Sequence, residues 1–330
     1  MANTTANTPA IRRAEVYSSL ILDEIKDGFL PEGLHRDVTD FGDGDTLFIT
    51  TFGEVVLRDL QEDQDTPVDA LDTGRITLQI TEHKGAGSYL TDELKEDSWQ
   101  AAQFDASIVP KHLRAIQEAY ETDLLSTFPS NQTAGNTNNI NNYAHRYVAG
   151  DGTDRLMSIE DIIYAKLAFD KANLPQEGRI MIVDPIVEAT LNSLTNLVNV
   201  SNNPHFEGIV ETGFAKNMKF IRNIMGFDIW VSNRLPRVAA QETLDTTAGT
   251  TVAAPAGSDA AEVGDIINQA WCVADDMTTP LMGAWRRMPM TEGFRNTPKR
   301  RDEFYTSARW GFGTQRPQAG LSIITDSTQY

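Results

Sequence analysis

The segments EGRIMIVDP (177–185) and IMGFDIWVSNRLP (224–236) decide the fold class of this chain. Each contains a short run of β-branched and other apolar residues, which is typical of a buried strand. Asp184 and Pro185 follow the first run, and they suit the N-cap and the first position of a helix. A Gly- and Asn-rich link leads to the second run. The order strand, helix, link and strand predicts a compact α/β unit.

Nothing in this unit offers a nucleophile, a metal cluster or a phosphate-binding loop. The rest of the chain lacks GxSxG, a Walker loop and a GxGxxG after a strand, and its histidines show no HxxxH or HExxH spacing. These histidines are His35, His83, His112, His145 and His205. The sequence therefore favours a structural protein over an enzyme, and we expect no cofactor.

Three short motifs have simpler explanations than a binding site. The cluster Asp40–Asp45 resembles a calcium loop, but it lacks the residue order of an EF-hand, so we expect turns there and no metal. The pairs Gly85-Ala86-Gly87 and Gly311-Phe312-Gly313 are expected to be strand kinks or bulges.

Composition indicates an ordinary globular protein of 330 residues, with 40% hydrophobic and 23% charged residues. No apolar run approaches the roughly 18 residues of a membrane span, and the polar N-terminus does not resemble a signal peptide. The single cysteine, Cys272, excludes an internal disulfide framework. It lies in an apolar run, so we expect a buried, inert thiol and not a reactive one.

The net charge of −19 argues against a dedicated nucleic-acid binder. The charge is unevenly placed, because residues 53–97 hold 12 acids and 4 bases, whereas residues 285–316 hold 8 bases and 3 acids. Two readings stay open. Either these are two solvated faces, or the two segments meet, within one chain or between neighbouring copies.

A long β-hairpin is predicted near the N-terminus. Residues 46–62 read as a strand, residues 62–74 are acidic and turn-rich, and residues 75–82 alternate with Ile76, Leu78 and Ile80 on one face. Because a two-stranded hairpin is marginal alone in water, this one must lie on the body of the same chain or on a neighbouring subunit.

Helical periodicity recurs at 11–26, 91–104, 107–128 and 158–167, and Ser107 and Ser158 are expected N-caps. The third helix carries an apolar stripe of Leu113, Ile116, Tyr120, Leu124 and Phe128. Residues 130–157 are Asn-rich and residues 237–265 are Ala/Thr/Gly-rich. We expect both to be insert-like, and the first to bury little surface.

In this order, the parts of the chain resemble the major capsid proteins of tailed bacteriophages, which have the Hong Kong 97-type fold. Three stretches carry the resemblance: GDTLFITTFGEVVLRDLQEDQD (44–65), SIEDIIYAKLAFDKANLPQEGRIMIVDP (158–185) and IMGFDIWVSNRLP (224–236). The resemblance covers nearly the whole chain. It implies an α+β fold with an N-terminal arm, an extended loop, a peripheral domain with a long spine helix and an axial α/β domain.

The resemblance also implies domain boundaries. They are 1–39 for the N-terminal arm, 40–90 for the extended loop, 91–149 for the peripheral domain with its spine helix, 150–279 for the axial domain with an insert at 237–265, and 280–330 for the C-terminal part of the peripheral domain.

The function that the resemblance implies is that of a major capsid protein. Such a protein self-assembles into pentamers and hexamers of an icosahedral shell around double-stranded DNA, which it encloses without specific binding. The implied partners are further copies of the chain, a separate scaffolding protein, a portal and a cement protein. The implied location is the virion, after assembly in the host cytoplasm and without a membrane. The alternative within the fold is the shell of an encapsulin-like bacterial nanocompartment. A receptor-binding β-protein is disfavoured by the helical content.

The resemblance gives the charge asymmetry a mechanism, because the family's extended loop lies across the adjacent subunit. We hypothesise that acidic loop residues of one copy contact basic residues of the next. The acidic residues are Glu54, Asp59, Glu62, Asp63 and Asp65, and the basic residues are Arg286, Arg287, Lys299, Arg300 and Arg301. Some family members crosslink a loop lysine to a neighbour's asparagine. The loop tip 62–74 has no lysine here, so a non-covalent shell is expected.

Overall fold

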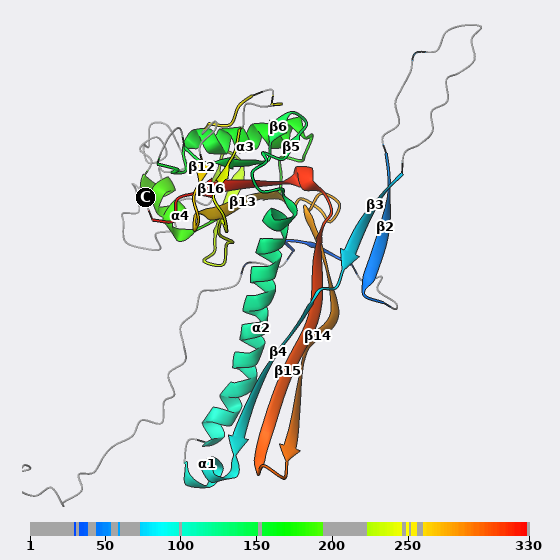
Figure 1. The fold of residues 1–330 in the computed structure, drawn as a ribbon, viewed down its shortest axis with the longest axis vertical. Coiled ribbons are helices and arrows are strands. Elements are labelled where there is room, and N and C mark those ends of the chain that lie inside the picture. The colour runs from blue at the N-terminus through cyan, green and yellow to red at the C-terminus, as the bar shows by residue number, and fades with distance from the viewer. Residues whose placement is uncertain are drawn as a thin grey trace, which may run out of the picture.

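The computed structural model describes residues 30, 33–38, 44–53, 59, 73–98, 101–150, 154–193, 223–245, 249–250, 252–255 and 260–328. It has three parts: a six-stranded sheet with its helices, a long helix lying along a four-stranded sheet, and a projecting two-stranded hairpin (Figure 1). This confirms the expected α+β class. The expected helix at 11–26 and the hairpin tip at 62–72 lie outside the described residues.

The six-stranded sheet contains the predicted α/β unit. Its strand order is β7 (Arg146–Val148), β16 (Gly320–Thr325), β13 (Ile266–Cys272), β8 (Arg179–Val183), β10 (Phe227–Val231) and β9 (Asn223–Ile224). Strands β8 and β10 are parallel neighbours, and helix α4 (Pro185–Ser193) follows β8. The Asp184 carboxylate accepts the backbone N–H of Ile186 at 3.1 Å, which confirms Asp184 as the N-cap.

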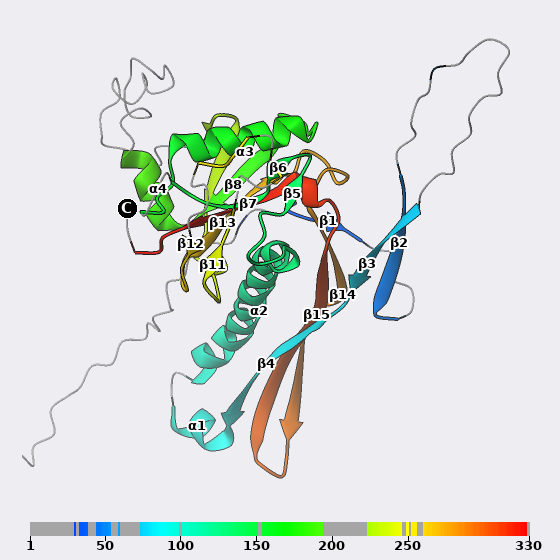
Figure 2. The ribbon, with the colours of Figure 1, turned by 45° about the horizontal axis from the view of Figure 1, so that its top comes forward.

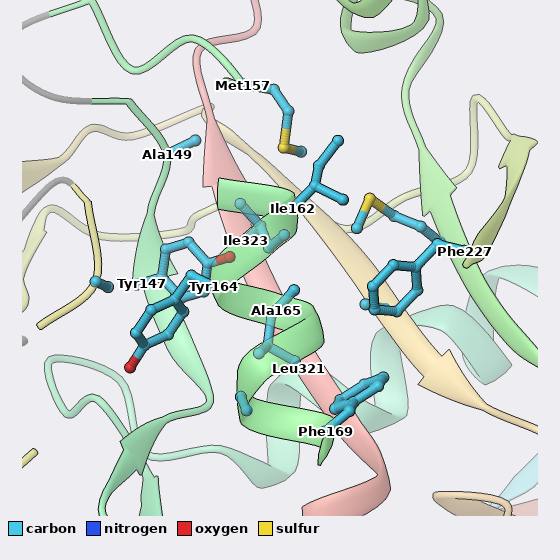
Figure 3. Packing of buried hydrophobic residues seen from close by; sticks show 14 of the residues in the cluster. Tyr147, Ala149, Met157, Ile162, Tyr164, Ala165, Phe169, Phe227, Leu321 and Ile323 are labelled. Carbon is cyan, nitrogen blue, oxygen red and sulfur yellow. The ribbon is translucent and has the colours of Figure 1, made fainter. Parts of the chain in front are cut away.

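Helix α3 (Ile159–Lys171) lies along one face of this sheet and supplies much of its core. Figure 3 shows Ile162, Ala165 and Phe169 on the side of the helix that meets Phe227 and the strand carrying Ile323. The predicted cap is also present, because Ser158 and Asp161 form a reciprocal capping box.

The second part is an elongated two-layer structure. Its sheet has the order β1 (Arg36–Asp37), β14 (Leu281–Asn296), β15 (Arg301–Thr314) and β4 (Glu82–Thr91). Helix α2 (Ala101–Asn131) runs along one face of this sheet (Figures 1 and 2). Ile116 on the helix packs against Ala308 and Trp310 on β15, so the expected apolar stripe does face a sheet.

The predicted break between two helices at residues 104–107 is wrong. The helix is continuous over Ala101–Asn131 and includes Pro110, while the short helix α1 (Asp92–Asp97) ends before it. Ile108, His112 and Ile116 are spaced by four residues, and all three are buried. This packing continues through Pro110, so tertiary contacts override the local preference of proline for a first turn.

The hairpin consists of β2 (Thr46–Phe52) and β3 (Thr73–Gln79), paired in register from Thr46↔Gln79 to Phe52↔Thr73. Its apolar face packs at its base against Met282 and Ala284 of the four-stranded sheet. Beyond this base the hairpin projects away from the body (Figure 2). The two predicted strands are confirmed over these residues.

The expectation that residues 130–157 bury little surface is wrong for their second half. Residues 143–150 are all buried, and β7 is a strand of the six-stranded sheet. Two short pairs complete this region: β5 (Asn139–Ile140) with β6 (Tyr143–Ala144), and β11 (Glu242–Thr243) with β12 (Ala260–Ala261). Leu244 and Ala261 are fully buried with Ile267 and Ile324, so the 237–265 stretch is also anchored in a core.

The C-terminal strand lies apart from β14 and β15. Strand β16 pairs with β13 and β7 and not with the four-stranded sheet. The reason is that Leu321 and Ile323 face the core under α3, whereas β14 and β15 face α2. The C-terminal strand therefore belongs to the six-stranded sheet.

The glycine pairs do not mark bulges. Strand pairing is regular through Gly85 and Gly87, and the register shifts lie between Trp285 and Met290. These glycines instead allow atoms of neighbouring strands to approach the backbone closely. A β-carbon on Gly311 would lie 2.3 Å from the carbonyl oxygen of Gln79, where the base of the hairpin crosses β15. Cys272 is buried as expected, and burial raises the pKa of its thiol.

Candidate assembly surfaces

The first candidate surface is the outward face of the hairpin. Phe48 and Phe52 alternate with residues of the packed face, so both rings point away from the core; they are 52% and 73% exposed. The guanidinium of Arg75 on the opposite strand lies 3.9 Å from the centre of the Phe48 ring. Arg75 is the register partner of Thr50, so this face presents two exposed aromatic rings with a positive charge between them.

The second candidate surface is the face of the four-stranded sheet opposite α2, here called the outer face. The large exposed side chains on it are Tyr89, Met290, Phe294 and Tyr305, with Met288 in the neighbouring bulge. Phe294 stacks on Tyr305 with ring centres 6.0 Å apart. Gly87 leaves space for the Tyr305 ring, whose nearest atom would lie 2.9 Å from an added β-carbon. Exposed aromatic and methionine residues gathered on one face are typical of an interaction surface.

The predicted basic patch is split in two by the structure. Arg286 and Arg287 lie at the β14 irregularity, whereas Lys299, Arg300 and Arg301 lie at the β14–β15 turn. Arg287 is nine positions along β14 from Asn296, beside the turn, so the two groups are about 30 Å apart. Arg287 pairs with Glu292 at 2.8 Å, and Arg301 pairs with Glu303 at 2.6 Å. Of the acidic loop residues, Asp59 is described and exposed. Glu54, Glu62, Asp63 and Asp65 lie outside the described residues.

An ion-pair network that the sequence analysis missed fixes the tip near this turn. Arg295 donates to both carboxylate oxygens of Asp92 at 2.6 and 2.5 Å and to Asp302 at 3.0 Å, and Lys95 also pairs with Asp302. Hydrogen bonds from Arg295 and Lys95 lower the pKa values of Asp92 and Asp302 respectively. Arg295 and Asp302 are register partners across the turn. Their opposite charges on either side of the turn were the signal that the sequence offered for this network.

Glu303 is the most perturbed of these carboxylates. Hydrogen bonds donated by Tyr305 and Arg301 lower its pKa to about 2. Arg301 also lies over the Tyr89 ring, 4.4 Å from its centre. Arg301 is therefore committed to contacts within the chain, and of the three basic residues at the turn it is the least suited to recruit a partner.

One pair resembles a nucleophile and its base, because Ser88 Oγ lies 2.6 Å from His112 Nε2. The other ring nitrogen of His112 faces Thr306 Oγ1 at 3.3 Å, and the imidazole is buried between α2 and the sheet, which lowers its pKa. A hydroxyl takes the place where a carboxylate would orient the base. The contact serves to join α2 to β4 and β15.

The described ranges contain neither a metal-binding cluster nor a membrane-spanning helix. No group of three or more His, Cys, Asp or Glu side chains there is arranged to hold a metal ion. None of the described helices combines the length and apolar character of a membrane span.

Comparison with known proteins identifies the family of the chain. The model of a family described as phage capsid protein matches residues 75–323. Among solved structures, the chain is similar to the capsid of Cyanophage P-SCSP1u, with a TM-score of 0.70 and 15% identity over 94% of this chain and 92% of that chain. It is also similar to a structure of Mycobacterium phage Che8, with a TM-score of 0.61 and 16% identity over 94% and 96%.

A third similar structure is the mature capsid of bacteriophage PhiM1, with a TM-score of 0.62 and 14% identity over 98% of each chain. No curated protein matches the chain. At such identities the structural likeness establishes the fold, while the family model covers three quarters of the sequence. The chain belongs to the phage capsid protein family, as a structural protein of the virion shell with the Hong Kong 97-type fold.

Proposed function

We propose that copies of this chain assemble into pentamers and hexamers of an icosahedral shell around double-stranded DNA. In this proposal, the hairpin β2–β3 of one copy docks on the outer face of the four-stranded sheet of a neighbour. The observation that carries it is that one chain presents two uncovered surfaces with exposed aromatic side chains on different parts. A contact between unlike surfaces is heterologous, and it generates closed rings when the rotation between successive copies closes.

The electrostatics support double-stranded DNA as the content. A net charge of −19 keeps packaged DNA from adhering to the wall, which suits a shell that must later release it. The family match also favours this over an encapsulin-like compartment around protein cargo. A portal, a separate scaffolding protein, a cement protein and assembly in the host cytoplasm are part of the proposal. We assign no catalytic role to the chain.

The parts of the structure take the following places in this proposal. The six-stranded sheet with α3 and α4 is the axial domain, now including β7 and β16. The α2 layer is the peripheral domain, and β2–β3 is the extended loop. Residues 1–39 are the N-terminal arm. We also retain the proposal that acidic loop residues contact a basic group on a neighbour, now placed at Lys299 and Arg300.

The test is electron microscopy with light scattering on the expressed protein, alone and with the genes beside it. Wild-type protein is expected to form shells or free capsomers. Phe48→Ser with Phe52→Ser should leave unassembled subunits with an unchanged melting temperature, because both rings are exposed. Thr50→Ser, on the same face between them, is the matched control. Normal shells from the double variant would contradict hairpin docking, and a wild-type protein that stays monomeric with its neighbours would contradict the shell itself.

A further inference from the structure

The outward face of the hairpin carries a central positive charge between two aromatic rings. Phe48 and Phe52 lie two positions to either side of Thr50 on β2, and Arg75 is the register partner of Thr50 on β3. A strand rises by about 3.3 Å per residue, so side chains four positions apart are separated by about 13 Å. The other described residues of this face carry no charge.

The outer face of the four-stranded sheet has the same arrangement with the opposite charge. Met290 and Phe294 lie two positions to either side of Glu292 on β14, so they are also separated by about 13 Å. Glu292 is the register partner of Tyr305, whose ring stacks on Phe294. Its carboxylate is 60% exposed, in the middle of the exposed aromatic and methionine side chains.

Glu292 is better placed than Glu303 to receive a partner on this face. Glu303 is buried and accepts hydrogen bonds from Arg301 and Tyr305. Glu292 pairs with Arg287 at 2.8 Å, and both of these side chains are exposed. An exposed ion pair contributes little to stability, so docking can replace it with a contact that is shielded from water.

Arg75 is held in a position that suits such a contact. Its guanidinium lies 3.9 Å from the centre of the Phe48 ring, which keeps the side chain on the outward face. A guanidinium that lies over a ring still has N–H groups at its edge, and these can donate two parallel hydrogen bonds to a carboxylate. The hairpin projects away from its own sheet beyond its base, so the carboxylate that it meets belongs to another copy (Figures 1 and 2).

We propose that Arg75 of one copy pairs with Glu292 of the next copy, with the flanking apolar side chains of the two faces packed around this contact. The inference rests on the proposed function, in which the hairpin docks on the outer face, and it names the pair that sets the position of docking. A shifted position would place each charge against apolar side chains without a partner, which is costly. Because the charge is central on both faces, the match holds for either relative direction of the strands.

Charge exchange tests the pair. Arg75→Glu or Glu292→Arg alone should raise the protein concentration at which shells form by about tenfold or more, because like charges then face each other. The double variant should assemble at nearly the wild-type concentration. Both side chains are exposed, so the melting temperatures should stay near that of the wild type.

A milder variant guards against misfolding. Glu292→Gln removes the charge without placing a second arginine beside Arg287, so it remains informative if Glu292→Arg does not fold. It should also raise the concentration needed for assembly, but less than the reversal does. Glu262→Gln is the matched control, because Glu262 is 62% exposed and lies before β13 of the six-stranded sheet.

Crosslinking tests the same contact independently of charge. Arg75→Cys copies are mixed with Glu292→Cys copies under assembly conditions and treated with bis-maleimidoethane, which joins two nearby thiols. The native Cys272 is buried in every copy and is therefore protected. We expect crosslinked dimers from this mixture, and none when Glu262→Cys takes the place of Glu292→Cys.

Assembly of Arg75→Glu at the wild-type concentration would overturn the inference and leave the proposed function standing. Failure of the double variant to recover, when both single variants fold, would do the same, as would the absence of crosslinks in a mixture that assembles. Wild-type protein that forms neither shells nor capsomers would contradict the proposed function itself, and the pairing with it.

Discussion

The guanidinium of Arg146 donates to the carboxylate of Glu242 across 2.5 Å, and both side chains are 5% exposed. The two residues lie in the two polar stretches that the sequence indicated as inserts. The second oxygen of Glu242 accepts the backbone N–H of Gly135 at 2.6 Å, so the pair ties both stretches together. They are part of the six-stranded unit and not separate decorations.

Breaking this pair should be costly. Glu242→Ala or Arg146→Ala leaves a buried charge without a partner, so we expect each to lower the free energy of unfolding by about 3–5 kcal/mol. The double variant should lose much less than the sum, because the two residues are coupled. Urea unfolding monitored by circular dichroism measures this. Arg287→Ala, which breaks the exposed pair with Glu292, is the control and should cost less than about 1 kcal/mol. Additive losses would contradict the assigned coupling.

Asp161 predicts a pH dependence of stability. Burial raises its pKa to about 6 although it accepts hydrogen bonds from Ser158 and Gly150. Because this folded-state pKa lies above the unfolded value of 3.8, the folded protein binds the proton more tightly. The stabilisation is therefore complete below about pH 4 and is lost as the pH rises through about 6, with an upper limit of about 3 kcal/mol.

The measurement is the free energy of unfolding between pH 4 and pH 7. Asp161→Asn should flatten the profile in this window, because the amide does not titrate. Glu160→Gln, an exposed carboxylate in the same turn of α3, is the matched control. A profile of Asp161→Asn that parallels the wild type would show that other groups produce the pH dependence.

Gly311 is predicted to be essential for the position of the hairpin. An added β-carbon would lie 2.3 Å from the Gln79 carbonyl oxygen and 2.7 Å from the Ile80 Cα, and both of these are backbone atoms that cannot rotate away. Gly311→Ala should therefore displace the base of the hairpin, cost about 1–3 kcal/mol and reduce assembly strongly. Thermal unfolding and electron microscopy test this.

The control for that substitution is Gly293→Ala. An added β-carbon there would lie 3.4 Å from the Phe304 ring, an ordinary contact, so shells should form. If Gly311→Ala assembles as well as Gly293→Ala does, the close approach does not fix the hairpin.

Charge reversal at the β14–β15 turn is expected to weaken assembly. Lys299→Glu with Arg300→Glu removes positive charge from two exposed positions that face a neighbour in the proposed shell. The yield of shells should fall, and raising the salt concentration should weaken wild-type assembly in the same direction. Light scattering follows both.

Reversal of Arg301 is less informative, because it also breaks the contacts with Glu303 and Tyr89. Arg300 has a φ of 46°, so Arg300→Asn removes the charge with a residue that tolerates this left-handed conformation. This variant should show a smaller loss than the reversal. Normal shells from the double reversal would exclude the turn as an assembly contact.

Local chemistry predicted those elements whose signals lie close together in the sequence. Asp184 and Pro185 start α4, and Ser158 with Asp161 starts α3, because capping needs atoms only a few residues apart. The alternation at 46–52 and 75–79 predicted the hairpin strands for the same reason. The continuous helix through Pro110 was missed because burial against β15, about 200 residues later, outweighs the local cost of proline.

The candidate site was only partly predictable. Acidic and basic segments were visible in the sequence, but the separation of the two basic groups by about 30 Å follows from the long β14 strand. Their engagement with Glu292 and Glu303 depends on register and turn geometry. The buried carboxylate of Glu121 accepts hydrogen bonds from Leu30 and Ser232, which lie 91 and 111 positions away, and no local pattern marks these contacts.

The sequence by itself determined the α/β unit, the hairpin strands, the apolar stripe of the long helix and the buried thiol, because periodicity, caps and residue size act over a few residues. The family was indicated by the resemblance of the chain to known capsid proteins. Only the tertiary structure decided that the Asn-rich stretch enters a sheet, that the C-terminal strand joins β13, and that Leu30 and Ser232 contact Glu121. These long-range contacts form because apolar faces must be buried and buried charges must be paired. The residues that meet these needs lie far apart in the chain, so no local pattern predicts which of them will meet.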